Sequence, residues 1–176
     1  MKKEKLFKII LTAILVSINV ILERFIPAYQ LWYINLNLGF VTVAFAACYL
    51  GPQYAVLVGG LGDLIGALIK PFGPYFVGYT ITNMLVGLCL GLFLYKKATV
   101  FKISIAVIIN TITCSLLLNT YFIYIFSTSG KGYLAILTGR APTIIVTAVI
   151  QIVIISVLFT HKSKINQLIK KAFPKF

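Results

Sequence analysis

The stretch GLGDLIGALIKPFGPY, residues 60–75, places a single carboxylate among long runs of apolar residues. Leu, Ile, Val, Gly and Ala dominate the sequence on both sides of Asp63, and Lys70 follows seven residues later. Pro71 and Pro74 stand where a helix can end or begin without losing an interior hydrogen bond. The pattern predicts the end of one apolar helix, a short connection and the start of the next helix.

The composition of the whole chain has the same character. The 176 residues are 60% hydrophobic, only 11% are charged, and the mean hydropathy is +1.02. A soluble domain of this length has too little interior to bury so much apolar surface. A bilayer supplies an apolar solvent instead, and each helical crossing needs about 20 mostly apolar residues. The sequence therefore predicts an all-α integral membrane protein, built as a single membrane domain.

Short stretches of polar and charged residues divide the chain into six apolar segments, and each segment is predicted to form one transmembrane helix. Five of the six prolines, Pro142 among them, fall at or near the ends of these segments. The segments span about residues 6–25, 36–51, 53–70, 74–95, 101–126 and 140–160, and a basic tail, 161–176, follows them.

The positive charges are distributed unevenly around these six segments. Six crossings put both termini on one side, which then carries twelve of the sixteen Lys and Arg residues; the other side keeps Arg24, Lys70, Lys131 and Arg140. Because basic residues are enriched in cytoplasmic loops, we expect both termini to be cytoplasmic. The net charge of +13 is explained by basic residues that set the orientation in the membrane and contact anionic lipids. We therefore expect no nucleic-acid partner.

The sequence offers few groups for catalysis. The one histidine, His161, lies at the inner end of the last predicted helix, whereas Asp63 belongs to the outer half of the third. No Ser-His-Asp set can assemble across that distance. No Cys/His cluster has the spacing of metal ligands, and no Gly-rich phosphate loop carries its lysine. We therefore expect neither an enzyme nor a bound cofactor or metal.

The remaining polar and aromatic residues gather toward the outer ends of the predicted helices, where helical spacing aligns them. The fourth segment carries a single stripe at positions i, i+4, i+7 and i+8, formed by Tyr75, Tyr79, Thr82 and Asn83. The last segment opens with Arg140, and its stripe continues with Thr143, Thr147 and Gln151.

Together these stripes describe a pocket open to the outside, with aromatic walls, a cationic rim, and a carboxylate and an amide lower down. Its ligand should be flat, anionic at one end and rich in hydrogen-bond donors at the other. A pterin ring with a carboxylate tail has these properties. The residues expected to bind it are Arg24, Trp32, Asp63, Lys70, Tyr75, Tyr79, Asn83, Asn119, Lys131 and Arg140.

Several of these residues also have a simpler interpretation. Trp32 is equally typical of an interfacial aromatic belt, and Glu23 is expected only to pair with a neighbouring cation. A carboxylate facing lipid is costly, so Asp63 should face protein or water. There it serves either as an acceptor for a ligand or as a counter-ion, for example of Lys70 or Arg140.

Three stretches resemble a known family: YLGPQYAVLVGGLGDLIGAL (49–68), FGPYFVGYTITNMLVGLCLGLFLY (72–95) and LLLNTYFIYIFSTSGKGYLAILTGR (116–140). They are similar to the substrate-binding S components of energy-coupling factor (ECF) vitamin transporters, and the third stretch resembles the folate branch. The resemblance implies a multi-pass protein of the bacterial cytoplasmic membrane that binds folate with high affinity near its outer face. It also implies docking on a transmembrane T component that is driven by two ATPase subunits.

The resemblance gives the first segment a role as well. Ala13 and Ser17 form a small-xxx-small pair that matches the family's motif for docking on the T component. Other pairs with this spacing, expected to serve packing inside the bundle, are Gly62/Gly66 and Gly87/Gly91. The alternative functions are an S component for another vitamin or heterocycle, and a small membrane protein of assembly or signalling without a ligand.

Overall fold

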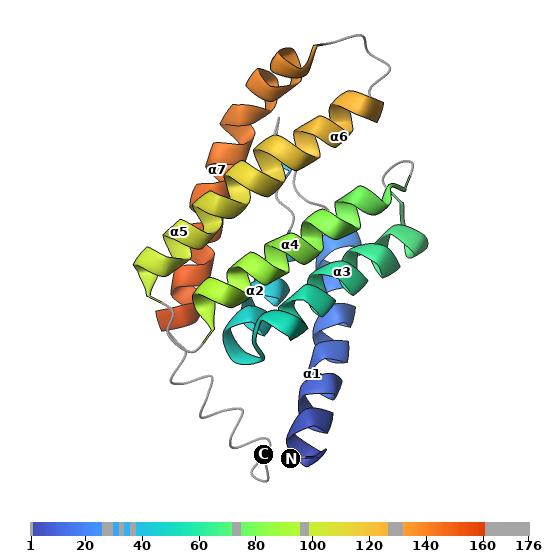
Figure 1. Cartoon of the computed structure of the whole chain (residues 1–176), viewed down its shortest axis with the longest axis vertical. Helices are drawn as coiled ribbons and strands as arrows, with labels where there is room; N and C mark the ends of the chain where they lie inside the picture. The colour runs from blue at the N-terminus through green and yellow to red at the C-terminus, as the bar shows by residue number, and fades with distance from the viewer. Residues whose placement is uncertain are drawn as a thin grey trace.

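The chain folds into a bundle of long apolar helices (Figure 1). The computed structural model describes residues 2–25, 30–31, 34–35, 38–71, 75–95, 99–126 and 132–160. Within these residues, five helices are long and apolar enough to cross a membrane, and a sixth apolar helix is shorter. The all-α membrane fold predicted from composition and hydropathy is confirmed.

Two of the crossings change from α-helix to π-helix along their length. The first joins α1 (Lys2–Val20) to the π-helical turn η1 (Ile21–Phe25), and the fifth runs without a break through α5, the π-helix η2 and α6. The other elements are α2 (Phe40–Tyr49), α3 (Pro52–Ile69), α4 (Val77–Leu94), α5 (Val100–Asn110), η2 (Thr111–Leu118), α6 (Asn119–Phe126), α7 (Tyr133–Thr160) and two paired antiparallel strands, β1 (Gln30–Leu31) and β2 (Ile34–Asn35).

The bounds of the second and the last helix differ from the prediction in ways that affect the site. The second spans only Phe40–Tyr49, about 15 Å of helix, which is shorter than the hydrocarbon core of a bilayer. The last begins at Tyr133 rather than near residue 140, so Arg140 and Pro142 lie inside α7. The sequence predicts that Pro142 marks the start of a helix, but transmembrane helices tolerate interior prolines because neighbouring groups satisfy the freed backbone carbonyl.

Glycines allow α3 and α4 to approach closely. A Cβ at Gly87 would meet the backbone of Ala55, and one at Gly91 would meet the backbone of Pro52. Small residues have this role in bilayers, where helices associate through packing rather than through a hydrophobic force. The prediction that this glycine pair packs inside the bundle is confirmed.

The apolar core lies toward the end of the bundle that contains α2. Ala44, Ala46 and Ala47 of α2 pack there with Val58 of α3 and Ile103 of α5, and all five are almost fully buried. In Figure 1, α1, α3 and α4 lie together, and α5, α6 and α7 stand beside them.

Candidate ligand-binding cavity

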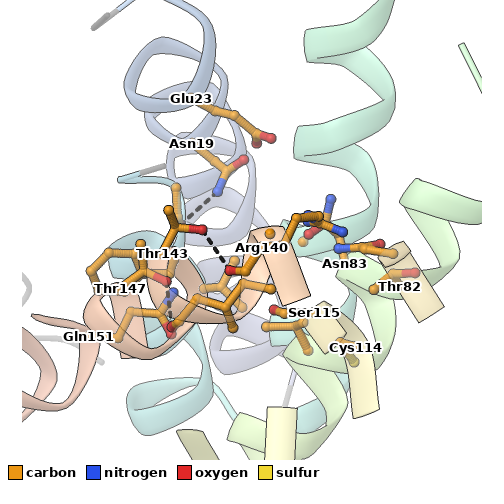
Figure 2. A pocket seen from close by; sticks show the side chains of 18 residues that line it. Asn19, Glu23, Thr82, Asn83, Cys114, Ser115, Arg140, Thr143, Thr147 and Gln151 are labelled. Carbon is orange, nitrogen blue, oxygen red and sulfur yellow. Dashed lines mark hydrogen bonds between the residues drawn. The ribbon is translucent and has the colours of Figure 1, made fainter. Parts of the chain in front are cut away.

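A cavity of about 450 Å³ lies between the two groups of helices. Binding sites for small molecules in proteins have volumes of about 300–1,000 Å³. Figure 2 shows the labelled side chains from α1, η1, α4, η2 and α7 arranged around it. Its polar lining consists of Asn19, Glu23, Thr82, Asn83, Ser115, Asn119, Arg140, Thr143, Thr147 and Gln151.

The structure describes eight of the ten residues predicted to bind a ligand, and three of these eight line the cavity. They are Asn83 of α4, Asn119 at the start of α6 and Arg140 of α7. Helical spacing predicts that Thr143, Thr147 and Gln151 share a face with Arg140, and these residues line the cavity too. The polar stripe of the last helix is therefore confirmed, although the helix begins earlier than predicted.

Arg140 brings a positive charge to the cavity wall. Its Nη1 donates a hydrogen bond of 2.9 Å to Oγ1 of Thr120, a fully buried residue of α6. Thr120 in turn donates to the carbonyl oxygen of Ser115 at 3.3 Å, so the guanidinium is held between α7 and α6. Among the described residues the ion pairs are those of Arg24, so Arg140 has no carboxylate partner there. The cavity therefore offers a cation to an anionic ligand.

Arg24 and Asp63 lie outside the cavity lining and pair with each other. Arg24 Nη2 is 3.2 Å from Asp63 Oδ1, and both side chains are 7% exposed. Arg24 Nη1 also donates to the carbonyl oxygen of Lys70 at 3.4 Å. The second carboxylate oxygen of Asp63 accepts a hydrogen bond of 2.6 Å from Thr80, whose hydroxyl is 2.9 Å from that of Tyr75. The counter-ion of Asp63 is thus Arg24 rather than Lys70 or Arg140.

The glycines of the GLGDLIG stretch make this ion pair possible. A Cβ at Gly66 would lie 2.8 Å from Nε of Arg24, and one at Gly62 would overlap the side chain of Asn19. The side chains of α1 and η1 therefore lie directly against the bare backbone of α3, with Asp63 between the two glycines. The prediction that Gly62 and Gly66 serve internal packing is confirmed.

The other predicted residues either do not line the cavity or lie outside the described part of the chain. Tyr75 is 42% exposed. Tyr79 packs edge-to-face on Phe76 and Phe122, with ring centroids 6.0 and 5.9 Å apart. The exposed Lys70 places its Nζ 5.7 Å from the ring of Phe25. Trp32 and Lys131 lie outside the described residues.

Sequence reasoning missed the carboxylate that does line the cavity. Glu23, expected only to pair with a cation, is 3.9 Å from Arg24 and also faces the cavity. Asn19 lies one turn before it, and its Nδ2 donates to the carbonyl oxygen of Gly39 at 2.9 Å and to Thr42 Oγ1 at 2.7 Å. The i, i+4 spacing of Asn19 and Glu23 in the first segment was the available signal.

Comparisons with known proteins agree on one family. The family model described as "ECF transporter, substrate-specific component" matches residues 7–159. A protein of Clostridium novyi (strain NT), named folate transporter FolT, is 31% identical over 143 residues, which cover 81% of this chain and 76% of that protein. A FolT of Leuconostoc mesenteroides subsp. mesenteroides is 27% identical over 169 residues, covering 93% of this chain and 90% of that protein.

A solved structure has the same fold. It is described as the crystal structure of FolT bound with folic acid, and it superposes with a TM-score of 0.75 at 24% sequence identity. The match covers 85% of this chain and 90% of that one.

Proposed function

The chain belongs to the family of ECF transporter substrate-specific components, and from this premise we propose that its cavity binds folate. It is an integral protein of the cytoplasmic membrane. Two relatives are named folate transporters, and the protein of similar fold was solved with folic acid. These findings support folate over another vitamin as the ligand. We assign the protein no catalytic step, because binding alone is the role of a substrate-specific component.

The observation that carries the proposal is the position of Arg140 on the cavity wall. Its guanidinium lies on the wall of a 450 Å³ cavity and is oriented by Thr120, with no carboxylate partner among the described residues. Folate carries carboxylates on its glutamate tail, and guanidinium groups bind carboxylates through two parallel hydrogen bonds. We assign Arg140 to this tail.

Glu23 has the chemistry required at the other end of the ligand. The pterin ring presents an amino group and a ring N–H side by side, and a carboxylate can accept from both. Glu23 is the carboxylate that lines the cavity within the described residues. It comes from η1, whereas Arg140 comes from α7. We assign Glu23 to the pterin head, and Asn83 and Asn119 to the polar wall.

Replacing Arg140 by alanine should weaken folate binding at least tenfold. A hydrogen bond to a charged group contributes about 1.5–3 kcal/mol, and each 1.4 kcal/mol is a factor of ten. A bare pterin without the tail should bind the variant almost as well as the parent. Lys70→Ala is the matched control, because it removes an exposed cation outside the cavity. Equilibrium dialysis of the purified protein against folate, the bare pterin, riboflavin and thiamine provides the measurement. Unchanged folate affinity in a folded Arg140→Ala variant would remove Arg140 from the site.

Replacing Glu23 by glutamine should weaken folate and the bare pterin by the same factor, about tenfold, since an amide makes weaker hydrogen bonds than a carboxylate. Glu4→Gln on the first turn of α1 is the matched control. Thermal unfolding of the variant separates a loss of contacts from a loss of fold. The assignment fails if Glu23→Gln affects only folate, as is expected for Arg140→Ala.

We further propose that the protein delivers folate through a T component and two ATPase subunits, as the family implies. Ala13 and Ser17 are both exposed on α1. Ser17 Oγ donates to the carbonyl oxygen of Ala13 at 3.1 Å, so its hydroxyl is satisfied within the helix. The pair thus presents a shallow surface on which a partner helix can pack closely.

A further inference from the structure

A second cavity, of about 400 Å³, lies at the N-terminal end of α1. Its walls come from the first two turns of α1, the turn between α2 and α3, the first turn of α3, and Tyr95 after the last turn of α4. The lining residues of α1, Lys8 among them, precede Asn19 of the folate cavity by at least eleven positions, or about 16 Å along the helix. The two cavities are therefore separate sites.

The charge of this second cavity is positive. Lys5 and Lys8 line it together with one acid, Glu4. Neither lysine forms an ion pair within the described part of the chain. Lys8 Nζ is 5.9 Å from the centre of the Tyr54 ring, so an aromatic face holds this ammonium in place. Two ammonium groups in one cavity suit an anion such as a phosphate.

An apolar surface begins directly beside the cavity. Leu6, Ile9 and Ile10 of α1 are 56%, 59% and 51% exposed. Ile9 follows Lys5 by one helical turn, so a charged and an apolar group lie in line along the same face. A molecule that satisfies both has an anionic head and apolar chains.

We propose that this cavity binds the phosphate headgroup of an anionic phospholipid whose acyl chains lie along α1. The tyrosines support this, since Tyr54 and Tyr95 line the cavity and tyrosine is typical of the membrane interface. The basic end of the molecule is also the end predicted to be cytoplasmic, and that leaflet carries the anionic lipids. The proposal does not depend on the identity of the ligand in the other cavity.

The test is the lipid retained by the purified protein. Protein is equilibrated in micelles with equal parts of phosphatidylglycerol and phosphatidylcholine, and the retained lipids are counted by native mass spectrometry. The parent should retain phosphatidylglycerol in preference. Lys5→Gln with Lys8→Gln should lower its retention about fivefold or more, because each lysine near the surface contributes to the attraction of anionic lipid. The matched control, Lys3→Gln with Lys102→Gln, removes the same charge outside the cavity and should retain the lipid.

Three outcomes would overturn the proposal. The first is equal retention by the cavity variant and the control variant. The second is loss of phosphatidylglycerol from the variant Lys5→Arg with Lys8→Arg. This variant keeps both positive charges, so it should retain the lipid if charge is what binds it. The third is that millimolar inorganic phosphate raises the thermal midpoint through Lys5 and Lys8 while phosphatidylglycerol does not, which would assign the cavity to free phosphate.

Discussion

Replacing Asp63 by alanine is expected to lower the free energy of unfolding by about 3–5 kcal/mol, the largest stability effect anticipated for a single substitution in this chain. The carboxylate is buried, pairs with Arg24 at 3.2 Å and accepts a hydrogen bond from Thr80 at 2.6 Å. Its removal leaves the guanidinium of Arg24 buried without this counter-ion, in the part of the protein where water is scarce. Chemical unfolding in detergent measures the loss.

The controls distinguish the ion pair from simple packing. Arg24→Met with Asp63→Leu removes both charges and should be much more stable than Asp63→Ala, because apolar residues of similar volume can replace a buried pair. Lys70→Ala, at an exposed position, should change stability by no more than about 0.5 kcal/mol. If Asp63→Ala is as stable as Lys70→Ala, the ion pair does not hold these helices together.

The same variants address the role of Asp63 in binding. Asp63 is not among the residues that line the cavity. Asp63→Asn, which keeps the shape and one acceptor, should therefore bind folate within about threefold of the parent once it is folded. A loss comparable to that of Arg140→Ala would show instead that Asp63 contacts the ligand.

Most of the fold could be predicted because the bilayer imposes a length and a composition on every crossing. The segments at 53–70, 74–95 and 101–126 correspond closely to α3, α4 and the run from α5 to α6. The start of α7 could not be predicted in this way. Pro142 predicts the start of a helix near residue 140. Interior prolines are tolerated, however, where neighbouring helices supply hydrogen bonds.

Part of the site could also be predicted, because helical spacing shows which side chains share a face. It placed Arg140 and the polar residues after it on one stripe, and the structure agrees. Spacing does not show how each helix is rotated against its neighbours. The pairing of Asp63 with Arg24 depends on that rotation, through the bare surface that Gly62 and Gly66 offer to α1 and η1.

The same limit applies to Glu23 and Arg24, which are adjacent in sequence. One faces the cavity and the other faces α3, within a π-helical turn whose geometry differs from that of an α-helix. A helical wheel drawn for 3.6 residues per turn does not describe such a segment. The sequence therefore offers no sign that Glu23, expected only to pair with a cation, is the carboxylate that lines the cavity in place of Asp63.

Enlarging both small residues of α1, by Ala13→Leu with Ser17→Leu, should abolish folate uptake into cells and co-purification with the T component. Both positions are exposed, and Ser17 lies two residues before the buried Asn19, which places the two side chains on opposite sides of the helix. Added bulk at Ser17 thus projects away from the cavity. Folate affinity of the isolated protein should stay within about twofold, because a lipid-facing substitution to leucine is cheap in a membrane.

The matched control adds similar bulk to a different exposed surface. Ala135→Leu with Thr138→Leu does so on α7, at two exposed positions outside the cavity lining, and should leave both uptake and binding intact. If the α1 variant still supports uptake, the T component docks elsewhere. If it loses folate binding as a purified protein, this face of α1 packs inside the bundle. Loss of uptake with retained folate binding is the result expected if α1 faces the folate cavity on one side and the T component on the opposite side.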